Sequence, residues 1–524
     1  MSVARTIAKN TAYNFVITAS ETIFNLFIGI LLARFLGPAD YGLYSFLIWF
    51  LYFVFLFANL GLGHMVIRFI AEAIGQQNQA EVKSLINLAF WFRFIAAAVC
   101  VIIIIAFSGY WSDLFGYPEN RGLFILVALC IIPQVFNFLL VSIFSGFQKY
   151  EYGAYVVLGT SPLRALGIVI VVILGMGIEE VLYVSIGSWI LGIFIGLFLL
   201  RRLVPLDAIL ARPSLTPSMR RAFKYSLIMM GVWGIQYFMR QRAEILFLGI
   251  FNPGEDVGFY TIAFLVSSAT IGTVLQVFST VLIPAVSEQV GRGDMARVRS
   301  IYLTSARYLM ILGIPMAIGG IILAGPIIRL VYGIEYEPAI ILLQILFIPF
   351  TLLAIANSAT SVILGVNQPS FVLKTGIWLV ILSLGLEIWL ISSHGAIGAA
   401  IGSSVARVIA PILYIRYASR ECRTSWPMMD TIKITLAALI MGGVIFAVGT
   451  QITRSSISIV VLVPLGTLIH FALIILFRVV QKEDIDILRK IQVGLPGLPR
   501  RIYTRLLDIV EMMVKKTYKK DIND

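Results

Sequence analysis

The chain has little charge, little cysteine and little histidine. Of its 524 residues, 13% are charged and 59% are hydrophobic, whereas roughly a quarter of the residues of a soluble globular chain are charged. Its 3 cysteines form no CxxC pair, which excludes a disulfide framework, and its 3 histidines lie too far apart in sequence for a metal-ligand motif. Because the surface of a soluble fold must still face water, this composition indicates a membrane protein.

Apolar runs separated by short polar turns extend through most of the chain. Runs of about 20 residues are long enough to cross a hydrocarbon layer of roughly 30 Å as helices. We therefore expect an all-α polytopic membrane protein of about 14 transmembrane helices. The expected spans are 11–34, 43–66, 87–108, 122–145, 154–175, 181–200, 226–250, 259–284, 306–330, 339–364, 372–391, 396–416, 432–450 and 457–478.

Basic residues are distributed unevenly over the turns. If the N-terminus is cytoplasmic, the outer turns hold only Arg34, Arg121 and Arg454, with Arg329 at a boundary. This bias predicts a multi-pass protein of the cell (plasma or inner) membrane with both termini in the cytoplasm. The net charge of +13 then reflects topology and a basic tail, and we expect no nucleic-acid partner. Residues 481–524 are expected to form a basic amphipathic helix on an anionic leaflet, with a solvated disordered tail as the alternative.

The chain matches itself when it is shifted by 216 residues. Phe35, Asp40, Gly42 and Tyr44 fall on Phe251, Asp256, Gly258 and Tyr260. We infer two copies of a six-helix unit, which are parallel because six is even, and transporters bind substrate between such halves. The expected domains are an N-terminal lobe 1–202, a cytoplasmic linker 203–220, a C-terminal lobe 221–418, two extra helices in 419–480, and the tail 481–524.

Ionisable residues inside membrane helices are costly and are candidates for function. The candidates are Glu21, Arg164, Arg240, Arg242, Glu244 and Glu387. In the first expected helix Glu21 and Asn25 share one face with Asn14 and Thr18. In the seventh, Trp233, Tyr237, Arg240 and Glu244 follow the same spacing, and Tyr237 is the repeat partner of Glu21.

The candidate residues suit an anionic sugar ligand. Arginine offers a planar fork of donors to phosphate oxygens, and Trp233 and Tyr237 suit the apolar faces of sugars. We expect substrate binding by Arg240, Arg242, Glu244, Trp233, Tyr237, Glu21, Asn25 and Arg164, and ion coupling, to H⁺ or Na⁺, by Glu21 and Glu387. Two alternatives remain open: a structural ion pair of Arg240 with Glu244, and a role for Arg164 in bracing a kink beside Pro162.

The sequence carries no enzyme motif. Every outer loop is short, whereas a glycan polymerase or ligase would need a larger outer region with paired carboxylates. No Walker A motif is present, so ATP does not drive the chain directly. Gly61-Leu62-Gly63 indicates helix packing rather than phosphate binding. We expect no enzyme, no metal and no cofactor.

Two segments at equivalent places in the repeat resemble a known family. Residues 32–45, LARFLGPADYGLYS, and the segment from Glu244 to Tyr260 are similar to Wzx-type polysaccharide flippases of the multidrug/oligosaccharidyl-lipid/polysaccharide exporter superfamily. The resemblance covers residues 5–480, and Glu244 stands where that family usually has Asp. It implies a V-shaped, two-lobe transporter with two extra helices.

The resemblance also implies a function. Such a protein moves a polyprenyl-(pyro)phosphate-linked oligosaccharide from the inner to the outer leaflet for surface polysaccharide biosynthesis, by alternating access through a cationic central cavity. Its partners would be this substrate, the lipid bilayer and glycan-assembly proteins. The alternatives are a drug/cation antiporter on the same scaffold, a flippase for a lipid II-type cell-wall precursor and, less favoured, a membrane glycan polymerase.

Overall fold

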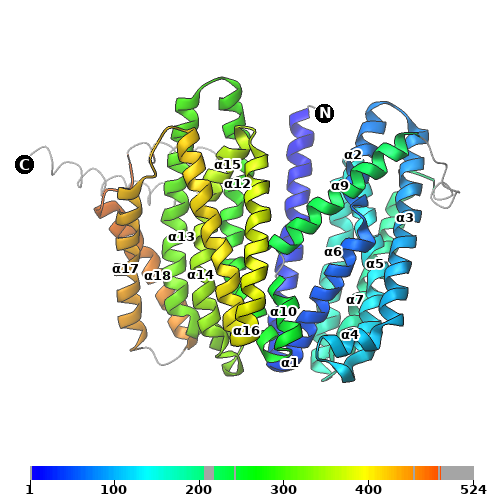
Figure 1. Ribbon diagram of the computed structural model, residues 1–524, viewed down its shortest axis with the longest axis horizontal. Helices are drawn as coiled ribbons and strands as arrows, with labels where there is room; N and C mark the ends of the chain where they lie inside the picture. The colour runs from blue at the N-terminus through cyan, green and yellow to red at the C-terminus, as the bar shows by residue number, and fades with distance from the viewer. Residues whose placement is uncertain (1–2, 206–216, 241–242, 452–454, 482–483, 485–524) are drawn as a thin grey trace, which may run out of the picture. The chain divides into compact units, whose positions relative to one another are not determined.

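A computed structural model describes residues 3–205, 217–240, 243–451, 455–481 and 484 (Figure 1). Throughout these residues the regular structure is helical and no strand is present, which confirms the all-α class. Ten of the described helices are long and apolar enough to cross a membrane. Two of the ten, α1 (Val3–Asn59) and α16 (Pro369–Glu421), each contain a non-helical glycine where two helices join. The expected count of fourteen therefore stays a prediction.

Contacts divide the chain into two compact units. Unit 1 comprises Met1–Thr261 with Glu387–Ala399, and unit 2 comprises Ile262–Leu386 with Ala400–Asp524. This division follows packing, whereas the expected lobes follow the repeat. It assigns α9 and α10, the first helices of the second copy, to unit 1. The expected lobe boundaries at 202 and 221 stay a prediction about the repeat.

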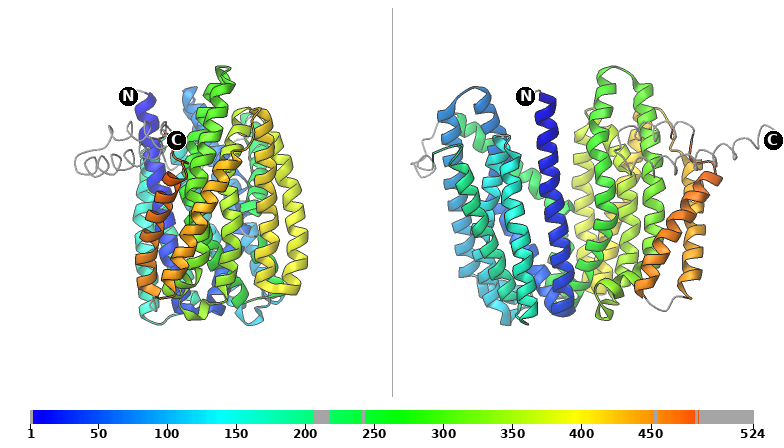
Figure 2. Two further views of the ribbon diagram at one scale, coloured as in Figure 1. Left: turned by 90° about the vertical axis from the view of Figure 1, so that its left-hand side faces the viewer. Right: turned by 180° about the vertical axis from the view of Figure 1, so that it is seen from behind.

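Unit 1 is a helical bundle built around α5. Beside α1, its helices are α2 (Leu62–Gly75), α3 (Gln79–Ala106), α4 (Ser108–Leu114), α5 (Arg121–Gly146), α6 (Tyr150–Ile173), α7 (Ile178–Leu200), α9 (Pro217–Arg240), α10 (Ala243–Phe251) and most of α11 (Glu255–Ser267). The α5 helix contacts α1, α2, α3, α6 and α7, and α1 runs beside α6 (Figures 1 and 2). The α9 helix crosses α2 obliquely (Figure 1).

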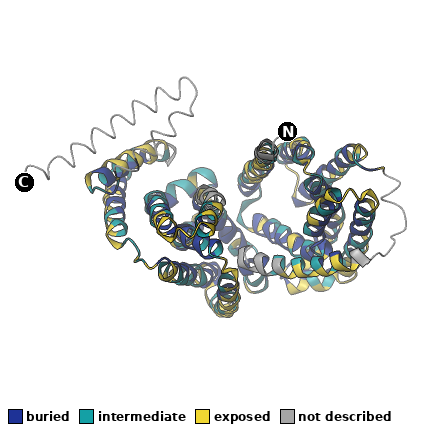
Figure 3. Ribbon diagram, turned by 90° about the horizontal axis from the view of Figure 1, so that it is seen from above, coloured by how far each residue is buried: buried dark blue, intermediate teal, exposed yellow. Residues whose placement is uncertain are grey.

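Unit 2 is built around the long helix α13 (Met295–Val331). Its other helices are α12 (Thr273–Gly291), α14 (Ala339–Ile355), α15 (Asn357–Gly365), α17 (Met428–Gly449), α18 (Ser455–Leu476) and most of α16. The last pair, α17 and α18, pack on each other and on α13 (Figure 2). Exposed residues lie along the helices of both units (Figure 3), and many of them are large and apolar, as in a bundle whose outer surface meets lipid.

Two of the helix ends follow directly from glycine. Gly37, at φ 75°, precedes Pro38 and ends the first half of α1, close to the expected end at residue 34. Gly395, at φ 52°, separates the two halves of α16 between the expected spans 372–391 and 396–416. Glycine adopts this left-handed backbone at little cost. The helix ends that the sequence predicts near residue 34 and between residues 391 and 396 are therefore present in the structure.

The expected span 43–66 is wrong at its end. Leu60 and Gly61 both have positive φ, so α1 ends at Asn59 and α2 starts at Leu62. A side chain at Gly61 would collide with the Ser226 carbonyl of α9, and the Ser226 hydroxyl donates to the Leu60 carbonyl. The break is thus where α9 docks, and the packing interpretation of this glycine is confirmed.

Candidate functional site

A polar cluster joins α1 and α6 within unit 1. The Nη2 of Arg164 donates to Asn25 Oδ1 at 2.5 Å, and Arg164 interacts electrostatically with Glu21, Tyr44 and Tyr52. Glu21 and Asn25 are exposed, although both lie within the apolar span that starts at Lys9. We call Glu21, Asn25, Arg164 and Tyr52 the Arg164 cluster.

The geometry of this cluster fits a hydrated surface. A charged group at the centre of a bilayer costs about 2.5–3.5 kcal/mol on insertion scales, so such groups face water, a partner or a ligand. Arg164 Nε is buried and has no hydrogen-bond partner among the described residues. Arginine can offer five N–H donors, and part of this capacity remains unused at the cluster. The arrangement can therefore receive an anionic or hydroxyl-rich group.

The expected polar face of the seventh helix is only partly described. Tyr237 is buried: its hydroxyl donates to the Trp49 carbonyl at 3.0 Å, and its ring lies 6.3 Å from Phe53. Trp233 is half-buried, with its ring 5.0 Å from that of His64. Both side chains therefore contact aromatic rings of unit 1, and Tyr237 is buried whereas its repeat partner Glu21 is exposed.

The charged end of that helix is described on both sides of residues 241 and 242. The structure describes α9 up to Arg240 and α10 from Ala243, both within the expected span 226–250. Arg242 and the side chain of Arg240 lie outside the described residues. Glu244 is buried on α10, and Glu387 is buried on the part of α16 that belongs to unit 1. The substrate and ion-coupling roles of these four residues stay predictions.

The expected set of charged membrane residues was incomplete. Arg93 is fully buried in α3, where it donates to the Val135 carbonyl at 3.3 Å and to the Asn59 side chain. A search for single charges inside the expected span 87–108 finds it, although average hydropathy does not. Because both partners come from other helices, Arg93 ties α3 to α5 and to the end of α1 beside the Leu60–Gly61 break.

Unit 2 contains two further arginines within its long helices, Arg307 on α13 and Arg407 on α16. Arg307 Nη2 and the Tyr308 hydroxyl both contact Asp484 Oδ1 at 2.6 Å, and Arg307 and Asp484 are buried. This pair ties the segment after α18 to α13. Arg407 on α16 lies over the Phe264 ring, 5.4 Å from its centroid.

The two family-like segments meet in unit 1 through a reciprocal glycine contact. The 216-residue shift pairs Pro38 with Gly254 and Gly42 with Gly258. A side chain at Gly42 would collide with the Gly254 carbonyl, and a side chain at Gly258 would collide with the Pro38 carbonyl. Such reciprocity is typical of a contact between two copies related by a two-fold axis. We call these four residues the glycine junction.

Two polar contacts stabilise the second segment of the junction. The Gly254 N–H donates to the Tyr117 hydroxyl at 2.8 Å. Burial raises the pKa of Tyr117, and the Gly254 hydrogen bond partly opposes this rise, so the phenol is neutral at physiological pH. The Asp256 carboxylate accepts from the Ala396 N–H at 3.0 Å, next to the Gly395 kink. The segment is thereby held against both α16 and the loop after α4.

Comparisons with known proteins agree with these features. The pattern of the family described as polysaccharide biosynthesis protein matches residues 31–341, which begin just before the glycine junction. The chain belongs to this family. The resemblance to Wzx-type flippases is therefore confirmed.

A curated relative covers nearly the whole chain. The Haloferax volcanii protein named "Probable low-salt glycan biosynthesis flippase Agl15" is 24% identical over 462 residues, which are 87% of this chain and 93% of that protein. The family and this relative identify a multi-pass membrane protein.

Two solved structures show the same fold at low identity. The lipid II flippase MurJ in an inward closed conformation has a TM-score of 0.70 and 18% identity, over 89% of this chain and 99% of that one. An inward-facing multidrug resistance MATE family transporter of the MOP superfamily has a TM-score of 0.62 and 17% identity, over 77% of this chain and 94% of that one. Both are transporters, and at this identity the likeness concerns the fold.

Proposed function

We propose that the chain is a flippase that moves a polyprenyl-(pyro)phosphate-linked oligosaccharide from the inner to the outer leaflet for surface polysaccharide biosynthesis. The observation that carries the proposal is the Arg164 cluster, a half-buried arginine beside an exposed carboxylate and an exposed amide on helices that are otherwise apolar. A lipid-linked sugar needs such a surface, because its phosphate and hydroxyl groups lose water on leaving the leaflet. The family and the glycan-flippase relative support the same substrate class.

The export of surface glycan in cells tests this function. A strain without the chain is expected to accumulate lipid-linked oligosaccharide on the inner leaflet and to lose surface glycan, and the native chain is expected to restore it. The likeness to a multidrug transporter fold favours drug/cation antiport as the second candidate. Restored drug efflux with no change in surface glycan would support that candidate and refute the flippase.

We also propose alternating access through a cationic central cavity, with the glycine junction as a contact that parts on one side of the membrane during the cycle. Glycines allow backbones to approach closely without side chains that interlock, so such a contact can separate without breaking a packed core. Coupling to H⁺ or Na⁺ at Glu21 and Glu387 is part of this proposal. Collapse of one gradient at a time during export distinguishes the two ions.

The junction is testable by adding one side chain. Gly42→Val is expected to lower export several-fold, because its side chain meets the Gly254 carbonyl in the structure described here. Gly75→Val is the matched control, since nothing lies within 4 Å of a side chain added there. Export by the Gly42 variant equal to that of the control, at equal protein abundance, would contradict the role of the junction.

A further inference from the structure

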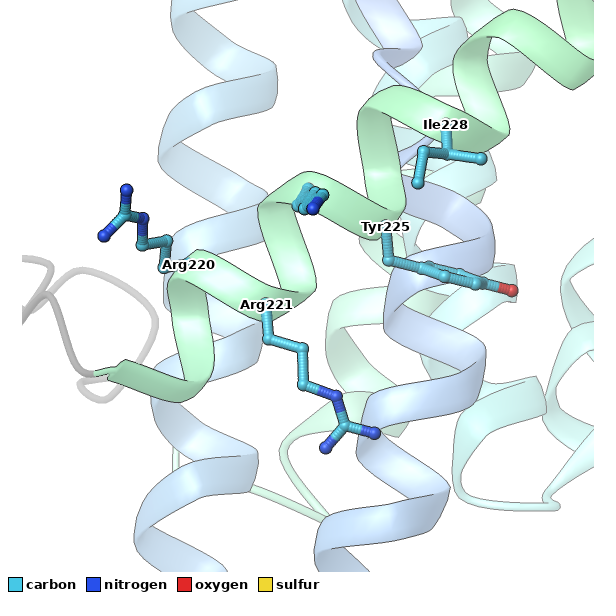
Figure 4. A pocket seen from close by; sticks show the side chains of 5 residues that line it. Arg220, Arg221, Tyr225 and Ile228 are labelled. Carbon is cyan, nitrogen blue, oxygen red and sulfur yellow. The ribbon is translucent and has the colours of Figure 1, made fainter.

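A second basic site lies at the start of α9, away from the Arg164 cluster. An open pocket of about 560 Å³ is lined by Arg220, Arg221, Lys224, Tyr225 and Ile228 (Figure 4). Arg221, Lys224, Tyr225 and Ile228 follow helical spacing and share one face. Figure 4 shows Arg220 and Arg221 leaving the helix in different directions, with Tyr225 and Ile228 further along. The cations are thus spread around an opening.

The α2 helix adds a fourth cation and one carboxylate. The Arg68 guanidinium lies 4.7 Å from the centroid of the Tyr225 ring. Arg221 Nη1 lies 3.1 Å from Glu72 Oε1, and the Arg221 side chain remains 62% exposed. One ion pair therefore neutralises only part of the positive charge.

An exposed apolar surface continues from the cations along α9. Leu227 is 47% and Ile228 is 55% exposed, one turn beyond Lys224. Side chains that combine exposed cations with exposed aliphatic groups are typical of contact with a lipid, whose phosphate and acyl chain occupy neighbouring layers. A free anion would use the cations and leave this apolar surface unexplained.

We propose that this α9 pocket binds the phosphate headgroup of a membrane lipid, in the leaflet that the basic turns predict to be cytoplasmic. Arg220 and Lys224 are its main phosphate ligands, Arg221 is shared with Glu72, and Ile228 contacts the first part of the acyl chain. The headgroup can belong to a bulk anionic phospholipid or to a polyprenyl pyrophosphate. The site does not require the flippase function, because lipid binding is measured without transport.

Native mass spectrometry of the purified full chain tests the site. The probes are phosphatidylglycerol, undecaprenyl pyrophosphate and phosphatidylcholine at equal concentration. Each cation near an anionic surface contributes roughly fivefold in affinity, so Arg220→Gln with Lys224→Gln is expected to lower binding of an anionic lipid about 25-fold. Arg297→Gln with Arg299→Gln is the matched control, because it removes two exposed arginines of unit 2 and is expected to change binding little.

The pattern of loss identifies the source of the headgroup. Loss of both anionic lipids indicates a general phospholipid site, and loss of undecaprenyl pyrophosphate alone indicates a site for the carrier lipid. Glu72→Gln is expected to raise binding a few-fold, because Arg221 loses its counter-ion. Unchanged binding of both anionic lipids in the double variant, or an equal loss in the control, would overturn the proposal.

Discussion

Arg93 and Arg164 are both arginines in apolar helices of unit 1, and their surroundings differ completely. Arg93 is fully buried and donates to Val135 and Asn59. Arg164 is half-buried and donates to an exposed asparagine, and the Nε of each arginine is buried without a hydrogen-bond partner among the described residues. The difference shows that the presence of a charge in a membrane helix does not by itself mark a site. We expect a charge whose partners lie inside the bundle to have a structural role, and a charge whose partners lie at its surface to be a candidate for function.

The largest expected effect comes from the buried arginine. Arg93→Ala removes the donor that contacts the Val135 carbonyl and the Asn59 side chain, and it opens a cavity beside the Leu60–Gly61 break between α1 and α2. We expect a loss of about 2–5 kcal/mol in stability, measured as a lower thermal midpoint and lower abundance of the purified protein. A variant with native stability and impaired export would place Arg93 with the functional groups instead.

A smaller effect, on export rather than on stability, is expected at the half-buried Arg164. Arg164→Ala removes one charged donor, and hydrogen bonds to charged groups contribute about 1.5–3 kcal/mol, so export is expected to fall roughly 10- to 100-fold. The thermal midpoint of Arg164→Ala is expected to stay near the native value. Arg164→Lys keeps the charge without the planar fork. Its export is expected to lie between that of the native chain and that of Arg164→Ala. A fall in stability that matches that of Arg93→Ala would remove the distinction between the two arginines.

Hydropathy and charge predicted most of the fold, because spanning helices are long apolar runs and their ends carry turn residues such as Gly37 and Gly395. The end of the expected span 43–66, which is the second half of α1, could not be predicted in this way. Apolar residues continue through Leu60 and Gly61, and the break is coupled to the docking of Ser226 from a distant helix. Tertiary contact determines this end, and hydropathy contains no information about it.

The candidate site was predictable in part. The helical spacing in the first helix correctly singled out Glu21 and Asn25 as polar positions on one face, and both are exposed near Arg164. The same spacing in the seventh helix predicts an open face, whereas Tyr237 is buried and Trp233 is half-buried against His64. Spacing identifies a face but does not say whether it meets a neighbouring helix or a ligand. The 216-residue repeat aligned the two halves of the glycine junction without indicating that they touch.

The most direct test of the central claim is a flipping assay in proteoliposomes that contain the purified chain and a fluorescent polyprenyl-pyrophosphate-linked oligosaccharide. We expect the native chain to move the lipid to the opposite leaflet under an ion gradient, and Arg164→Ala, at native thermal stability, to be slower by at least tenfold. Equal rates for the native chain and for protein-free liposomes would contradict the flippase function. Equal rates for the native chain and Arg164→Ala would contradict the assignment of the Arg164 cluster as its binding surface.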